Sequence, residues 1–132
     1  MERLERSYIN GYGNDLYPFR FVKFSDEGEV TLCSAGDLAI GVTLRNYRYT
    51  SSSSSTIDYV TPDDEPVPVV ISGITEVECG GTVSAGDIVA SDDDGKAVVM
   101  TNGQHGNGIA LEDGEDGSRI KILITHIALN IS

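Results

Sequence analysis

The sequence predicts an all-β fold: a small β-barrel or β-tulip-like domain with an internal duplication. Glycine accounts for 15 of the 132 residues, tryptophan is absent and long amphipathic helical runs are missing. This composition favours many short strands joined by glycine turns. The stretch Val83–Met100 repeats the pattern of Phe21–Leu32, and the two align without a gap from Val22/Val89 to Thr43/Ala110. We therefore expect two copies of one β unit.

The duplication is supported by where the matching residues stand. Turn residues recur in four pairs, Asp26/Asp93, Gly28/Gly95, Gly36/Gly103 and Gly41/Gly108. Glycine is the residue that a turn or a close backbone approach requires. Apolar positions match as well, and we expect six of these side chains to point inward: Phe21, Leu32, Val42, Ile88, Val99 and Ile109.

Each copy begins with a β-hairpin. In the second copy, short β-rich runs at Asp87–Ala90 and Ala97–Met100 flank an acidic turn that contains Gly95, and Phe21–Leu32 has the same form. A third strand is expected at Leu38–Leu44.

A further strand follows each copy, Val67–Ile71 in the first and Ile120–Ile124 in the second. It comes later in the first copy, which therefore carries extra loop. Alternation predicts separate strands at Ile74–Glu78 and His126–Ile131. Pro66 and Pro68 indicate an edge strand or a bulge, because proline cannot donate to a ladder.

These elements predict one β domain, residues 18–132, with copies at 18–71 and 85–124. Residues 1–17 are expected to form an extended arm, either a frayed terminus or a segment that orders on assembly, since its tyrosines are spaced by glycines. Residues 45–65, with five consecutive serines, are expected to form an exposed loop. This loop is either a solvated linker or a contact loop.

Composition narrows the class of partner. The formal charge of −12 would repel phosphates, so no nucleic-acid partner is expected. No apolar run is long enough for a membrane span, and the amino-terminal residues lack a secretory signal. Cys33 and Cys79 are too few for a disulfide framework, so we expect reduced thiols in a cytosolic or virion setting.

No motif for catalysis or metal binding is found. The acidic turns Asp92–Gly95 and Glu112–Gly117 lack the spacing of a calcium loop. His105 and His126 have no sequence partner in a metal or nucleophile motif, and Asn102–Gly108 lacks the strand-to-helix context of a dinucleotide loop. We therefore expect no enzyme, cofactor or metal, and instead a protein that binds other proteins.

The runs AGDIVASDDDGKAVVM and GNGIALEDGEDGSRIKILI resemble the pattern of capsid decoration (cement) proteins of tailed phages. The resemblance covers residues 18–44 and 83–125, about half of the chain. It implies a homotrimer on the outer surface of the virion, assembled in the host cytoplasm, that binds the major capsid protein and stabilises its lattice. A β-clip-type ligand-binding domain or enzyme, and a tail-associated structural subunit, remain alternatives.

Partner contacts are expected from the arm and from the loop, because tyrosine and arginine supply contact area and hydrogen bonds in interfaces. The candidate contact residues are Tyr8, Tyr12, Tyr17, Arg45, Tyr47, Arg48 and Tyr49.

Overall fold

The computed structural model describes residues 3–49 and 59–127. The described residues form nine strands. Their bounds are β1 Leu4–Asn10, β2 Phe21–Asp26, β3 Glu29–Leu32, β4 Gly41–Thr43, β5 Pro66–Glu78, β6 Ile88–Ser91, β7 Ala97–Val99, β8 Gly106–Ala110 and β9 Arg119–Ile127. They contain no helix, and so none with the length and apolar character to cross a membrane. The predicted all-β class is confirmed.

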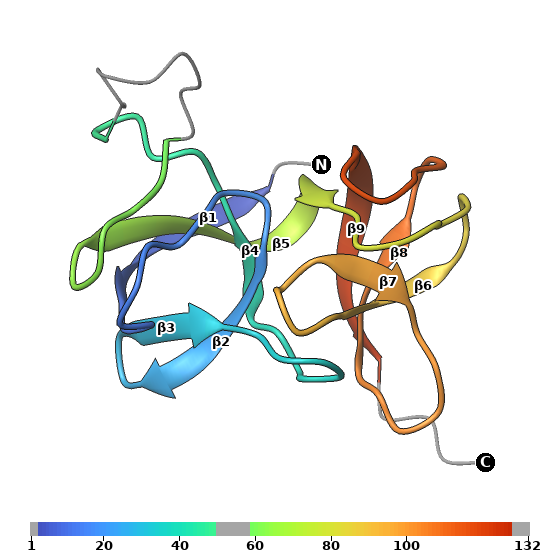
Figure 1. Cartoon of the computed structure of the whole chain (residues 1–132), viewed down its shortest axis with the longest axis horizontal. Coiled ribbons are helices and arrows are strands. Elements are labelled where there is room, and N and C mark those ends of the chain that lie inside the picture. Colours follow the sequence, from blue (N-terminus) through green and yellow to red (C-terminus); the bar gives the residue numbers. More distant parts are fainter. Residues whose placement is uncertain (1–2, 50–58, 128–132) are drawn as a thin grey trace.

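A small closed barrel forms one side of the molecule, and an open sheet forms the other (Figure 1). The barrel strands follow the order β1-β3-β2-β4-β5, and β1 also pairs antiparallel with β5, which closes the ring. The second half of β5 pairs with β9, and the sheet continues through β8 and β6 to β7. One strand, β5, therefore belongs to both parts.

Strand register confirms the duplication. Phe21 pairs with Val42 in the first copy, and the residues aligned with them, Ile88 and Ile109, pair in the second. The next step also agrees, because Val42 lies opposite Val70 and Ile109 lies opposite Leu123. The two copies thus place equivalent residues at equivalent points of their sheets.

Two kinds of glycine preserve this geometry. Gly28 and Gly95 have φ of +76° and +72° in the two hairpin turns, a conformation that L side chains rarely adopt. Gly41 has a different role: an added Cβ would lie 2.1 Å from the carbonyl oxygen of Val70. At Gly108 the corresponding distance, to the carbonyl oxygen of Leu123, is 3.0 Å. The close approach of β4 to β5 therefore requires glycine at position 41, whereas between β8 and β9 a side chain at position 108 would make a tight contact.

Two apolar clusters stabilise the fold. One is built from Val22, Val30, Val67 and Val69 of the barrel strands, with Leu16 from the segment after β1. The other joins the barrel to the open sheet. Its members are Phe21, Cys33, Ala39, Val42, Val77, Cys79, Val83, Val89, Ala97, Ala110, Ile120 and Ile122. The strands of the first copy therefore bury side chains on both faces.

Only part of the expected inward set is buried. Phe21 and Val42 are almost fully buried, whereas Leu32, Ile88 and Ile109 are half-buried. Val99 is 41% exposed, so the prediction for this residue is wrong. Val99 is the last residue of β7, which is the outermost strand of the open sheet. Among the described residues, no further strand pairs with the outer side of β7.

The amino-terminal segment differs from the predicted arm, because Leu4–Asn10 is β1 and completes the barrel. Likewise β5 is a single strand of 13 residues where two were predicted, with Gly73 at φ +95° inside it. The prediction of an edge strand or a bulge around Pro66 and Pro68 agrees with the ladders, because β4 pairs only with Val69 and Val70 and the β1–β5 register shifts between Val70 and Ser72. Both prolines pair with β1 alone, near the start of β5.

The loop between β4 and β5 is not uniformly exposed. The side chain of Asn46 is buried and donates hydrogen bonds to Thr61 Oγ1 at 2.9 Å and to the carbonyl of Pro66 at 2.8 Å. These bonds fix the two ends of the loop. The serine run, residues 51–55, lies outside the described residues. So does the end of the strand predicted at His126–Ile131, whose first two residues belong to β9.

Candidate functional site

Phe19, in the segment between β1 and β2, lies beside two arginine side chains. The guanidinium carbons of Arg45 and Arg119 are 5.2 and 4.7 Å from the centre of its ring. Both distances are those of cation–π contacts. Arg45 follows β4, whereas Arg119 is the first residue of β9. The two arginines that contact the Phe19 ring therefore come from different halves of the chain.

The backbone holds Phe19 in an unusual conformation. Its φ is +66°, which is rare for a residue with a bulky side chain. The N–H of Phe19 donates to the carbonyl of Thr43 at 2.8 Å, and its carbonyl accepts the N–H of Glu78 at 2.9 Å. Residues held in such conformations by their surroundings cluster at functional sites.

A second cationic group lies next to this ring. Arg20 Nη2 is 3.6 Å from one carboxylate oxygen of Glu78, and Lys96 Nζ is 3.3 Å from the other. Arg20 also donates through Nη1 to the carbonyl of Asp94 at 3.2 Å and lies over the ring of Tyr17. Its Nε is buried without a hydrogen-bond partner among the described residues.

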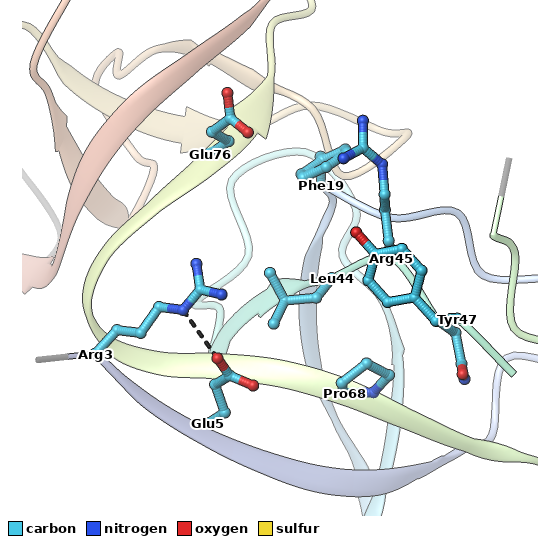
Figure 2. A pocket seen from close by; sticks show the side chains of 9 residues that line it. Arg3, Glu5, Phe19, Leu44, Arg45, Tyr47, Pro68 and Glu76 are labelled. Atoms are coloured by element: carbon cyan, nitrogen blue, oxygen red, sulfur yellow. Dashed lines mark hydrogen bonds and ion pairs between the residues drawn. The ribbon is translucent and has the colours of Figure 1, made fainter.

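Two adjoining hollows open around these groups. The smaller, of about 220 Å³, is lined by Tyr17, Pro18, Phe19, Arg20, Arg45, Glu78 and Arg119. The larger, of about 400 Å³, is lined by Arg3, Glu5, Phe19, Leu44, Arg45, Asn46, Tyr47, Pro68 and Glu76. Figure 2 shows Arg45 beside Phe19 at one side of the larger hollow and the Arg3–Glu5 ion pair at the other. Phe19 and Arg45 line both hollows.

The structure brings three of the predicted contact residues to these hollows: Tyr17, Arg45 and Tyr47. Tyr47 is 70% exposed, and its ring centre is 4.8 Å from that of Tyr59. Tyr12 lines a neighbouring hollow together with Tyr17 and Arg20. Four of the seven predicted residues thus lie on one connected region.

The other three predicted residues lie elsewhere or are otherwise engaged. Tyr8 packs edge-on against Phe24 and lines a separate apolar groove, also formed by Leu38, Ile40 and Ile71. The hydroxyl of Tyr49 donates to the carboxylate of Glu65, and this bond raises the pKa of Tyr49. Arg48 is exposed, and its backbone N–H donates a hydrogen bond to the Oδ1 of Asn46.

Sequence reasoning did not select Phe19, Arg20 or Arg119 as candidate contact residues. The sequence carries one usable signal: Arg119 is a cation two residues after the acidic loop Glu112–Gly117. No local pattern brings Phe19 and Arg119 together, because they stand near opposite ends of the chain and meet only through the folded sheet order.

The groups around Phe19 are arginine and tyrosine side chains, which can bind a partner through hydrogen bonds, charge and aromatic contact. Within residues 3–49 and 59–127, no group of three or more His, Cys, Asp or Glu side chains is gathered in a way that would hold a metal ion. Guanidinium groups present planar N–H donors that match carboxylates, and tyrosine adds contact area at low entropic cost.

Comparisons with known proteins agree with the fold and place the chain among phage proteins. A family model described as XM1 gp53 minor capsid protein matches residues 4–124. The crystal structure of the head fiber gp8.5 N base in bacteriophage phi29 is similar, with a TM-score of 0.69 and 15% identity. That similarity covers 97% of this chain and 100% of the phi29 chain. No curated protein matches the chain.

Proposed function

Because the chain belongs to the XM1 gp53 minor capsid protein family, its role is structural and associated with the phage capsid, and we propose that it is a decoration subunit. In this proposal it binds the outer surface of the head, contacts the major capsid protein and stabilises the capsid lattice. Its place is then the virion surface, after assembly in the host cytoplasm.

The observation that supports this proposal most directly is the cluster around Phe19. Arginine and tyrosine dominate the energetics of protein interfaces, and here Arg45, Arg119, Tyr17 and Tyr47 gather at one connected region. Phe19 is fixed by backbone hydrogen bonds to β4 and β5. A preorganised surface loses less entropy when a partner binds.

Self-association as a homotrimer is part of the same proposal. Subunits seated around a three-fold position of the shell would each offer one Phe19 cluster to the lattice. Several weak contacts made together give an avidity that one small hollow does not supply. The charge of −12 per chain favours an exposed position, where acidic surfaces repel one another and keep particles dispersed.

The test compares heads with and without the protein. Purified protein should co-sediment with heads that lack it and should raise the temperature at which those heads release DNA, through stabilisation by binding. The mass of the free protein in solution tests the trimer. Equal release temperatures with and without the protein would refute lattice stabilisation, and co-sedimentation with tails alone would favour a tail-associated subunit.

A further inference from the structure

We propose that the hollow formed by Arg20, Arg45 and Arg119 beside Phe19 is a carboxylate-binding site, which takes an acidic segment of the major capsid protein. This inference rests on the proposed function and names the chemistry of its contact. The hollow of about 220 Å³ has room for one or two acidic side chains.

The first argument for a carboxylate-binding site is that two arginine side chains have no carboxylate partner among the described residues. The chain has 21 acidic and 9 basic residues, so carboxylates outnumber cations by more than two to one. Glu78 is shared by Arg20 and Lys96. The guanidinium groups of Arg45 and Arg119, in contrast, have ring contacts but neither an ion pair nor a side-chain hydrogen bond with any described residue. Within residues 3–49 and 59–127, these two guanidiniums have no carboxylate partner, and they can therefore accept one from a bound protein.

The second argument is preorganisation. Cation–π contact holds each guanidinium near the Phe19 ring but supplies no acceptor for its N–H donors. The Nε of Arg20 is a further buried donor without a partner among the described residues. A buried donor left unpaired is costly, so the guanidinium of Arg20 is not fully satisfied by the described residues. The site therefore has spare donors in place before any ligand arrives.

The size and charge of the hollow favour a peptide carboxylate over a nucleic acid. A nucleic-acid strand is bound through a row of cations along its backbone, whereas here the cations surround one small hollow with Glu78 in its wall. The formal charge of −12 would also repel a polyphosphate chain. One or two carboxylates fit the planar guanidinium donors and add little charge.

The test measures binding to heads that lack the protein. Arg45→Ala and Arg119→Ala should each weaken binding about tenfold, and the double variant more; tenfold corresponds to about 1.4 kcal/mol. Arg119→Lys, which keeps the charge but loses the planar fork, should be intermediate. Arg6→Ala, at an exposed position on β1 outside both hollows, is the matched control and should bind within twofold of the wild type.

A second measurement uses a defined probe on the isolated protein. Acetylated tetraglutamate peptide should bind the wild-type chain in calorimetry and should bind the double variant at least tenfold more weakly. Inorganic phosphate and a short single-stranded DNA at equal charge should bind weakly to both. Equal peptide binding by wild type and double variant, or preferential binding of phosphate or DNA, overturns the carboxylate site.

The two proposals fail in different ways. If the wild-type protein binds heads and the double variant binds equally well, the carboxylate site is wrong and the decoration role stands. If the wild-type protein does not bind heads at all, the proposed function itself is wrong. Thermal unfolding midpoints of all variants should match the wild type, which separates lost binding from lost folding.

Discussion

Asn107 of β8 is hydrogen-bonded to Ala39 of the first copy: its Oδ1 accepts the N–H of Ala39 at 3.0 Å. The same side chain donates through Nδ2 to the carbonyl of Asp37 at 3.0 Å and is only 1% exposed. One buried amide thus joins the two copies. In the alignment of the copies, Asn107 corresponds to Ile40, whose side chain has no hydrogen-bonding group. The first copy therefore has no equivalent side chain that could make this bond to the second.

Replacing Asn107 by leucine should destabilise the fold. The N–H of Ala39 and the carbonyl of Asp37 would lose their partner in a buried place, which costs about 1–3 kcal/mol per unsatisfied group. The urea midpoint of unfolding measures the effect. Asn14→Ala, at an exposed position, is the control and should leave the midpoint unchanged. Equal midpoints for the two variants would contradict the role of Asn107.

Gly41→Ala should severely impair folding. The added Cβ would stand 2.1 Å from the carbonyl oxygen of Val70, so β4 and β5 would have to separate. Gly81→Ala adds the same methyl group where the nearest atom is 3.9 Å away, and it should be tolerated. Soluble yield and thermal midpoint of the two variants provide the comparison. A stable Gly41→Ala protein would show that the strands can move apart.

Phe21 and Ile88 occupy equivalent positions, but only Phe21 is covered by the other copy. Phe21→Ala should therefore cost about 3–5 kcal/mol, whereas Ile88→Ala should cost clearly less than the range of about 2–5 kcal/mol for fully buried sites. Denaturant titration of both variants measures the difference. Similar losses would mean that the outer face of the second copy is as well covered as that of the first.

The contribution of Asp37 to the free energy of unfolding should depend on pH. Burial alone would raise the pKa of Asp37, but hydrogen bonds from Lys23 at 2.6 Å and from the N–H of Ser34 at 2.9 Å lower it below 3.8. The unfolded chain then binds the proton more readily. The contribution of Asp37 is present above 3.8 and is lost as the pH falls through the folded pKa.

The destabilisation caused by Asp37→Asn should therefore be larger at about pH 7 than at about pH 3. Asp87→Asn is a matched control, because Asp87 accepts the N–H of Ser84 in the same kind of turn but Ala90 replaces the lysine. It should cost less at neutral pH. A pH-independent effect of Asp37→Asn would refute the linkage.

Cys33 should be unreactive in the folded protein. Burial, with a smaller effect of Asp37, raises the pKa of its thiol to about 12, so very little thiolate is present near neutral pH. Its contribution to stability is present below 9.0, the ordinary value, and is lost as the pH rises toward about 12. A thiol reagent at about pH 8 should label Cys33 only after denaturant is added. Rapid labelling of the native protein would contradict its burial.

Much of the fold could be predicted from the sequence because the duplication is carried by local features. Hairpin turns require glycine at Gly28 and Gly95, and strands require alternation, so both copies and their pairing follow from spacing alone. Which face of each copy is buried does not follow from spacing. It depends on how the copies pack, and this is why Val99 was misassigned.

The barrel was harder to predict for the same reason. Closure depends on pairing of β1 with β5, two strands far apart in the sequence, and the charged residues Arg3, Glu5 and Arg6 hide a strand signal. Deleting residues 2–13, which an arm would tolerate, should therefore open the barrel. Of the residues around the two hollows, composition had selected Arg45 and Tyr47, and their role in binding stays a prediction; the placement of Phe19 and Arg119 beside them depends on the tertiary arrangement.

The strand β5 has a mechanical consequence. Its 13 residues span a contour of roughly 40 Å and are bonded to β1 and β4 at one end and to β9 at the other. A force that pulled the barrel away from the open sheet would act along this continuous backbone. It would load many of the hydrogen bonds of β5 in shear at the same time. Because the strand itself is the junction, tension applied to one half is transmitted to the other along β5 without a loop in between.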